Sequence, residues 1–128
     1  MAYRMPWVLR ITGKSLYVNA ANETQCVEFV RQASMAPHTS TWRAGVRVKD
    51  ARPGQIPPGT AIATFVGGKY PTDALGRHAA IYLSHDQLGI TVLDQWVAQG
   101  EVKERVIKFQ VPPGTRRSND GSCFHVIE

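Results

Sequence analysis

The sequence is poor in cysteine and contains no long apolar run. Its two cysteines, Cys26 and Cys123, are too few for a disulfide framework, which leaves either two free thiols or one bridge. No segment approaches the roughly 18–20 consecutive apolar residues of a membrane-spanning helix, so we expect no membrane insertion. Residues 1–12 also lack the apolar core of about 7–15 residues that a signal peptide contains. We therefore expect a protein made in the cytoplasm and, if it acts outside, exported without a signal peptide, unless this sequence lacks its leader.

The sequence contains no dense run of basic or acidic residues, although its net charge is +5 and its pI is about 9.6. A positive surface attracts anionic partners, and nucleic acid, anionic lipid and the acidic bacterial cell wall all fit that description. Because the basic residues are scattered, without a run of five or more, we expect no nucleic-acid binding. The length of 128 residues and the hydrophobic content of 43% fit a single folded domain over residues 1–128.

One amphipathic helix is predicted near the start of the chain, after an irregular or extended lead-in over residues 1–16. Asn22 is a favourable N-cap residue, and Gln25 three positions later completes a capping-box pattern. Apolar residues then recur with helical spacing at Cys26, Phe29, Val30 and Ala33. The helix must end before Pro37, which cannot continue it.

The rest of the chain alternates short apolar runs with turns rich in glycine and proline. We predict strands at residues 46–49, 61–66, 78–83, 89–95 and 102–111. A helix followed by a group of antiparallel strands indicates the α+β class rather than a βαβ arrangement.

Cys26 falls in the first turn of the predicted helix, which is a favourable place for a nucleophile. Unpaired backbone N–H groups and the helix dipole favour an anion there, and such positions lower the pKa of a thiol. The same N–H groups can stabilise an oxyanion. Considered alone, a cysteine on an apolar stripe is more often a small core residue.

His78 opens the predicted strand 78–83, at the end of the sheet where a helix N-terminus could meet it. A histidine there could take the thiol proton and later protonate a leaving amine. Considered alone, such a histidine is more often a half-buried structural residue.

A third group follows from the pairing of strands 78–83 and 89–95, whose short connection predicts a hairpin. In one register His78 stands opposite Asp94; in another it stands opposite Trp96, with Asp94 as a diagonal neighbour. Both registers place His78 and Asp94 on one face, where a carboxylate orients the imidazole. A shift by one residue would place Gln95 there instead, so Gln95 stays the alternative to Asp94.

Four segments together resemble the papain-like NlpC/P60–CHAP cysteine amidases, and they occur in the order of that family over residues 21–96. The resembling segments are the nucleophile helix at residues 25–30, a core strand at 58–65, the catalytic-histidine strand at 77–82 and the following strand at 92–96. Two positions depart from the family pattern: Arg77 replaces the common glycine before the histidine, and Trp96 replaces a frequent asparagine.

The resemblance implies a papain-like NlpC/P60 fold, with the nucleophile helix packed on an antiparallel β-meander. It implies Cys26 and His78 as the essential dyad, Asp94 as the third group and an amide bond of peptidoglycan as the substrate. The small basic format is similar to amidase effectors of type VI secretion, which act in the periplasm of a rival cell and are neutralised by a cognate immunity protein. The two departures put substrate choice in doubt more than mechanism.

Several assignments stay open. Gln25 either donates to an oxyanion or closes the capping box, Trp42 either lines the cleft or packs, and Tyr82 shares the predicted face of His78.

Cys123 and His125 supply two metal-ligand types, too few for a zinc site, so we expect no metal and no cofactor. The alternatives to hydrolysis are a non-catalytic domain that binds cell wall or protein, and a cysteine deamidase or acyl-transfer toxin.

Overall fold

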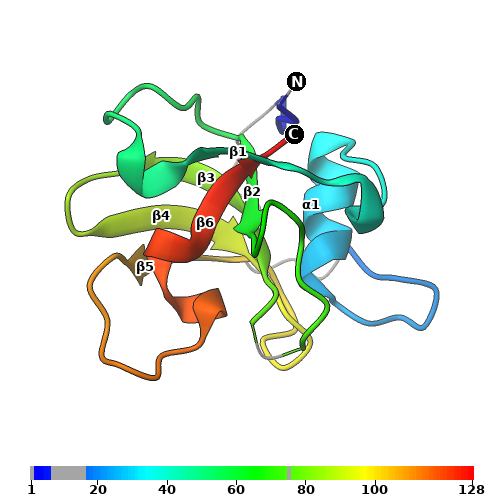
Figure 1. Cartoon of the computed structure of the whole chain (residues 1–128). Helices are drawn as coiled ribbons and strands as arrows, with labels where there is room; N and C mark the ends of the chain where they lie inside the picture. Colours follow the sequence, from blue (N-terminus) through cyan, green and yellow to red (C-terminus); the bar gives the residue numbers. More distant parts are fainter. Residues whose placement is uncertain (1, 7–16, 75) are drawn as a thin grey trace.

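The computed structural model describes residues 2–6, 17–74 and 76–128. Within them, one α-helix packs beside a six-stranded antiparallel sheet with the order β1-β6-β2-β3-β4-β5 (Figure 1). The elements are α1 (Cys26–Ser34), η1 (Thr39–Thr41), β1 (Ala44–Arg47), η2 (Val48–Asp50), β2 (Ala61–Thr64), β3 (Ala79–His85), β4 (Gly89–Asp94), β5 (Lys103–Lys108), η3 (Arg117–Asn119), η4 (Gly121–Cys123) and β6 (Phe124–Ile127). The predicted α+β class is confirmed.

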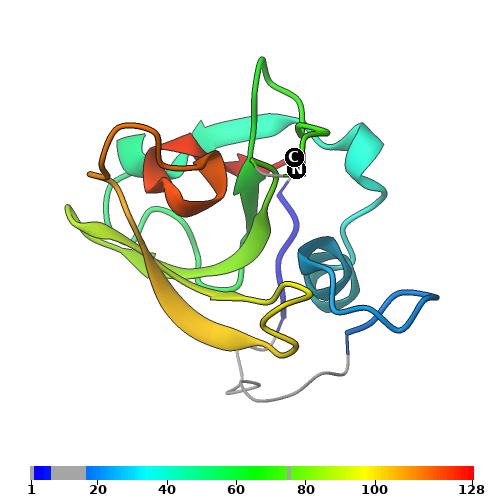
Figure 2. The same ribbon diagram turned by 90° about the horizontal axis from the view of Figure 1, so that it is seen from below.

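The sheet separates two hydrophobic clusters. On one face Ile81 and Leu93 pack with Phe29 and Val30 of α1. On the other face the sheet curls around a second cluster that takes side chains from β2 to β6 (Figure 2). Strands β2 and β3 are therefore covered on both faces, which explains why their sequences are nearly continuous apolar runs instead of alternating patterns.

The start of α1 differs from the prediction. The helix begins at Cys26, and the predicted capping box is wrong. Asn22 has a φ of 62°, in the left-handed region, and its N–H donates to the Asn19 carbonyl at 2.9 Å in a turn ahead of the helix. Gln25 is the N-cap and makes no side-chain capping hydrogen bond. The predicted end before Pro37 is confirmed, because Met35 adopts the left-handed conformation.

The predicted strands exist, but one strand was missed. Strand β6 lies between β1 and β2, where Val126 pairs with Ile62 and Ile127 pairs with Ala44. Four residues near the chain end give too short a pattern to predict a strand, and these pairings join segments far apart in sequence. The meander is therefore correct for β2 to β5, while β6 returns to the other side of β2.

The β3–β4 hairpin settles the register beside the predicted site. Ile81 lies opposite Leu93, and continuing this pairing places His78 opposite Trp96, with Asp94 as the diagonal neighbour. The second of the two predicted registers is thus confirmed at this end. A bulge after Tyr82 shifts the pairing nearer the turn.

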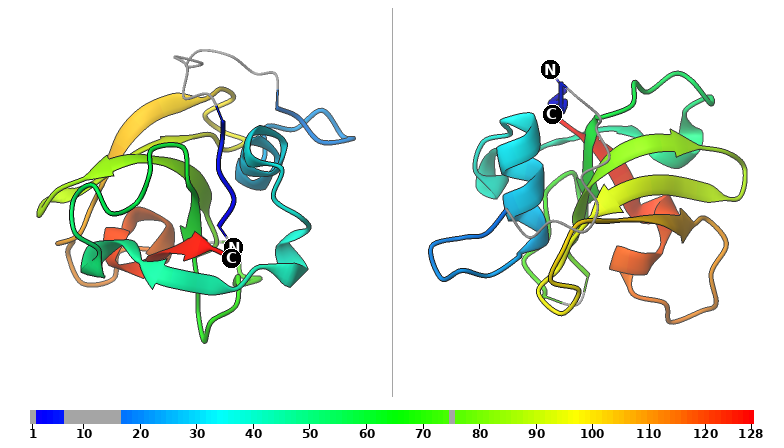
Figure 3. Two further views of the ribbon diagram at one scale, coloured as in Figure 1. Left: turned by 90° about the horizontal axis from the view of Figure 1, so that it is seen from above. Right: turned by 180° about the vertical axis from the view of Figure 1, so that it is seen from behind.

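The start of α1 lies at the end of the sheet where β3 begins and β4 ends (Figure 3). Most of the predicted lead-in over residues 1–16 falls outside the described residues. Of its described part, Arg4 forms an antiparallel bridge with Thr60. No helix in the described ranges has the length and apolar character needed to cross a membrane.

Candidate active site

The chain just before Cys26 is tied to the chain just after β4. The Gln95 side chain is fully buried, and its Nε2 donates to the Gln25 carbonyl at 2.9 Å and to the Tyr17 carbonyl at 2.7 Å. The Thr24 hydroxyl donates to the Trp96 carbonyl at 3.2 Å. These bonds hold the first residue of α1 against the end of β4, so Gln95 acts on the position of the helix start.

His78 is held by the end of β2. Its backbone N–H donates to the Thr64 hydroxyl oxygen at 3.0 Å, and the Thr64 N–H donates to the His78 carbonyl at 2.9 Å. The imidazole is 5% exposed and meets the rings of Trp96 and Phe124 edge-on. Both the backbone and the ring of His78 are therefore fixed before any substrate arrives.

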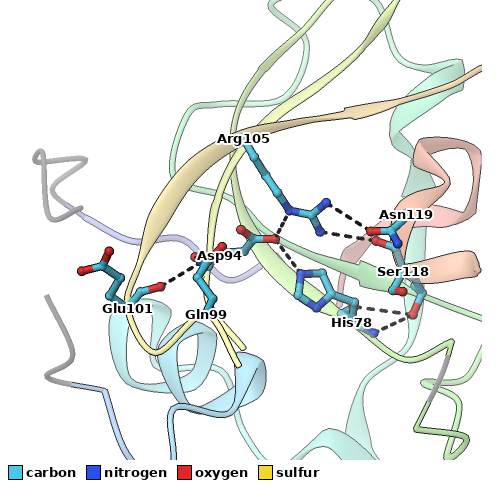
Figure 4. Close-up of polar contacts among 8 residues, drawn as sticks. His78, Asp94, Gln99, Glu101, Arg105, Ser118 and Asn119 are labelled. Atoms are coloured by element: carbon cyan, nitrogen blue, oxygen red, sulfur yellow. Dashed lines mark hydrogen bonds and ion pairs between the residues drawn. The ribbon is translucent and has the colours of Figure 1, made fainter. Parts of the chain in front are cut away.

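The His78 ring is hydrogen-bonded to a buried carboxylate. His78 Nε2 lies 2.7 Å from Asp94 Oδ2, and Arg105 Nε donates to the same oxygen at 2.7 Å (Figure 4). Arg105 also donates to Asn119 Oδ1 and the Ser118 carbonyl, at 3.3 and 3.4 Å. The partner of His78 is thus Asp94 and not Gln95, and Asp94 itself is held between two basic side chains.

The Cys26 thiol and the His78 imidazole are neighbours, because each shifts the pKa of the other through hydrogen bonding and charge. Because Asp94 engages Nε2, the nitrogen available to the sulfur is Nδ1. The sulfur also interacts with the Tyr70 hydroxyl, whose pKa is raised first by burial and then by the charge of Cys26. That phenol is therefore a buried, neutral O–H beside the sulfur, and its oxygen has no hydrogen-bond partner within the described part of the chain.

The pKa values of the two groups move in the directions that favour an ion pair. Burial raises the pKa of the Cys26 thiol, but the hydrogen bond and charge of His78, together with smaller contributions from the Ala79 backbone and the Tyr70 hydroxyl, outweigh burial, so the net pKa is below the ordinary value. Burial lowers the pKa of His78, yet its hydrogen bonds to Asp94 and Cys26 and the charges of these two groups raise it to about 9. Both shifts favour a thiolate beside an imidazolium over the neutral pair.

Two cavities adjoin Cys26. The larger, of about 470 Å³, is lined in part by His78, Trp96 and Arg105. The smaller, of about 220 Å³, is lined in part by Tyr70. Gln25, Cys26 and Arg77 line both cavities, so Cys26 lies where the two cavities meet.

For Trp42 and Tyr82, which were left open between packing and a substrate contact, the burial of both side chains favours packing. Trp42 is fully buried and donates from Nε1 to the Pro37 carbonyl at 2.9 Å, so it packs behind Tyr70 and does not line the cleft. Tyr82 lies in the cluster inside the curled sheet, 1% exposed, and cannot contact a substrate. Gln25 lines both cavities, and its side chain makes no capping hydrogen bond, so the capping-box alternative is wrong.

The sequence analysis missed Arg105, Tyr70 and Thr64. For Arg105 a signal existed, because it shares the parity of Ile107 and Phe109 and so interrupts the inward face of β5 with a charge. Tyr70 and Thr64 reach the site from a loop and a strand end. Nothing in their local patterns distinguishes them from packing residues.

Both cysteines are free thiols, so the alternative of a Cys26–Cys123 bridge is wrong. His125 Nδ1 lies 3.1 Å from the Gly45 carbonyl oxygen. In the part of the chain that the structure describes, no three histidine, cysteine or acidic side chains gather as a metal site would require.

Comparisons of the sequence with a family profile and with known proteins point to the same family. A family profile described as Domesticated amidase effector 2 (Dae2) matches residues 8–127. The type VI secretion amidase effector 2 protein of Salmonella typhi is 37% identical over 117 residues, covering 84% of this chain and 86% of that protein. Domesticated amidase effector 2 of Ixodes scapularis is 37% identical over 118 residues, covering 88% of this chain and 76% of that protein.

A solved structure agrees with the sequence matches. The structure of Type 6 secretion amidase effector 2 (Tae2) superposes with a TM-score of 0.74 at 36% identity, covering 88% of this chain and 84% of that chain. The predicted similarity to type VI amidase effectors is confirmed, and the family profile spans nearly the whole chain, including Cys26, His78 and Asp94. The chain belongs to the Domesticated amidase effector 2 family.

Proposed function

We propose that the protein is a cysteine amide hydrolase that cuts amide bonds in the peptide part of bacterial peptidoglycan. The observation that supports this most is the buried chain of contacts from the Cys26 thiol through the His78 ring to the Asp94 carboxylate. Relatives at 37% identity are named amidase effectors, which favours hydrolysis over a binding role or another acyl transfer.

In the proposed mechanism, the Cys26 thiolate attacks the carbonyl carbon of the scissile amide. The backbone N–H groups at the start of α1 and the Gln25 side chain would stabilise the oxyanion. His78 then donates its Nδ1 proton to the departing amine, and water releases the acyl group from the sulfur. Asp94 keeps the ring oriented and stabilises its charged form, which is the role of the third member of a triad.

The cellular setting follows from the relatives and is part of the proposal. A type VI secretion effector is exported into a target cell, and we expect this chain to act on the cell wall in the periplasm of a target bacterium. We also expect a cognate immunity protein that covers the cleft around Cys26, since a producing cell must protect its own wall. The net charge of +5 would assist binding to an acidic polymer.

The direct test incubates purified sacculi with the wild-type protein, Cys26→Ala and Cys123→Ala. We expect soluble fragments from the wild type and Cys123→Ala and none from Cys26→Ala, with circular dichroism verifying that all three are folded. Equal release by wild type and Cys26→Ala would contradict the proposal. Mass spectrometry of the fragments identifies which peptide bond is cut.

A further inference from the structure

We propose that Arg77, Arg105 and Arg116 form a carboxylate-binding subsite beside Cys26. The substrate would then carry a free carboxylate close to the scissile amide, and the protein would discriminate against the same peptide with that carboxylate amidated. This inference rests on the proposed hydrolysis and specifies the chemistry of its substrate.

The charge of the larger cavity carries the inference. Its described lining includes three arginines and no aspartate or glutamate. They come from three separate segments: the loop before β3, strand β5 and the turn that leads into η3. The smaller cavity keeps Arg77 but also contains Glu28, so its lining charges balance. The cleft is therefore cationic on one side of the sulfur and balanced on the other.

The three guanidinium groups are not equally compensated. Arg105 is paired with Asp94 and its side chain is 24% exposed, so it forms a fixed wall of the cavity. Arg77 is exposed and donates to the Thr72 carbonyl at a long 3.4 Å. Arg116 is exposed and makes no ion pair with a carboxylate in the described part of the chain, whereas its neighbour Arg117 is paired with Asp73. The uncompensated positive charge thus belongs to Arg77 and Arg116.

A carboxylate is the ligand that fits this charge and the reaction. A guanidinium binds a carboxylate through two parallel N–H···O bonds. The peptide stems of peptidoglycan carry free carboxyl groups next to their amide bonds, so a stem peptide with its amide at Cys26 brings such a group to the cavity wall. A carboxamide in that place loses the charge and one of the two acceptors.

The experiment compares a cross-linked muropeptide with the same molecule whose carboxyl groups have been converted to carboxamides. Hydrolysis of both forms is measured for the wild type, Arg77→Gln, Arg116→Gln and the control Arg52→Gln, which removes an equal charge from an exposed loop outside the cavity. Binding of both forms to Cys26→Ala, alone and with each arginine substitution, is measured by calorimetry.

We expect the wild type to cleave, and Cys26→Ala to bind, the free-acid form about tenfold better, the effect of one charge-assisted hydrogen bond. Arg77→Gln and Arg116→Gln should each reduce this preference to about threefold or less, while Arg52→Gln keeps it. Equal binding of both forms to Cys26→Ala, or an unchanged preference in both cavity variants, would overturn the subsite. Arginine-dependent binding of the free-acid form without any cleavage would support the subsite and refute the proposed hydrolysis.

Discussion

The two ends of β3 carry two buried histidines in different chemical settings. His78 is 5% exposed and His85 is 8% exposed. The ring of His78 meets a carboxylate at 2.7 Å and a thiol. The ring of His85 meets the Tyr82 hydroxyl at 2.6 Å and the Ala51 carbonyl at 2.7 Å. Burial and hydrogen bonding of the ring are common to both, so the partners distinguish the proposed catalytic histidine from the structural one.

The cavities at these two ends differ in the same way. The cavity beside His85 is the larger, about 680 Å³, and apolar residues such as Leu88 and Phe109 line much of it. The cavity beside His78 is about 470 Å³, and its lining includes Cys26, the proposed nucleophile, and three arginines. Size alone would select the end at His85, whereas the convergence of titratable groups supports the proposed site at His78.

Replacing each histidine with glutamine gives the sharpest contrast between the two ends. We expect His78→Gln to reduce hydrolysis by at least about 1,000-fold, since it removes the general acid and the partner of the thiolate. His85→Gln should keep the rate within about threefold and lower the free energy of unfolding by about 1–3 kcal/mol, because two buried polar groups lose a well-placed partner. Hydrolysis assays and urea unfolding measure the two effects. Equal loss of activity in a folded His85→Gln protein would contradict the comparison.

Asp94→Asn tests the partner that makes His78 different. We expect kcat/KM to fall about 100-fold. The hydrogen bond that His78 donates to Asp94 raises the pKa of His78, which reaches about 9 in the folded protein. Removing it lowers that pKa, so the imidazolium loses its proton at a lower pH and the alkaline limb of the pH–rate profile moves down from about 9. Glu104→Gln, an exposed acid on β5, removes the same charge and should leave the profile unchanged.

Gln95→Leu tests whether the helix start is held by β4. The substitution keeps the volume but removes the donors to the Gln25 and Tyr17 carbonyls. We expect about a tenfold loss of kcat, since Cys26 is no longer held against His78, and about 1–3 kcal/mol less stability. Gln87→Leu in the exposed hairpin turn is the matched control. A stability loss with unchanged kcat would mean that Gln95 does not position the nucleophile.

Thr64→Val should have the smallest effect. It removes the hydroxyl that accepts from the His78 N–H at 3.0 Å, leaving a buried donor without that partner. We expect a loss of about 1 kcal/mol in stability and about threefold in kcat. Thr91→Val on β4 makes the same change at a half-buried position away from the site, and an identical loss of kcat there would contradict a local role for Thr64.

Local patterns predicted the parts of this molecule that local chemistry determines. The apolar stripe predicted the helix around Phe29. The alternation of side chains along the strands predicted that His78 and Asp94 lie on one face. The prediction that His78 and Asp94 share a face was correct because both registers considered for the β3–β4 hairpin place them on the same face. Only a shift of the pairing by one residue would have separated them.

The remainder depends on contacts between distant segments. The helix start is set by a left-handed turn at Asn22 and by hydrogen bonds from Gln95, and neither can be read from residues 22–25. Strand β6 exists because β1 and β2 flank it. Arg105 reaches Asp94 only once β5 pairs with β4, so its role becomes visible in three dimensions.

The ion pair between Cys26 and His78 is the central claim, and alkylation tests it most directly. In a Cys123→Ser background, the rate of reaction with iodoacetamide is measured from pH 5 to 10, with and without His78→Gln. We predict a reactive Cys26 whose rate reaches half its maximum well below the value of about 8.5 for an ordinary thiol, and a shift to higher pH in His78→Gln. An unreactive Cys26, or a midpoint near 8.5 that His78→Gln does not move, would contradict the claim.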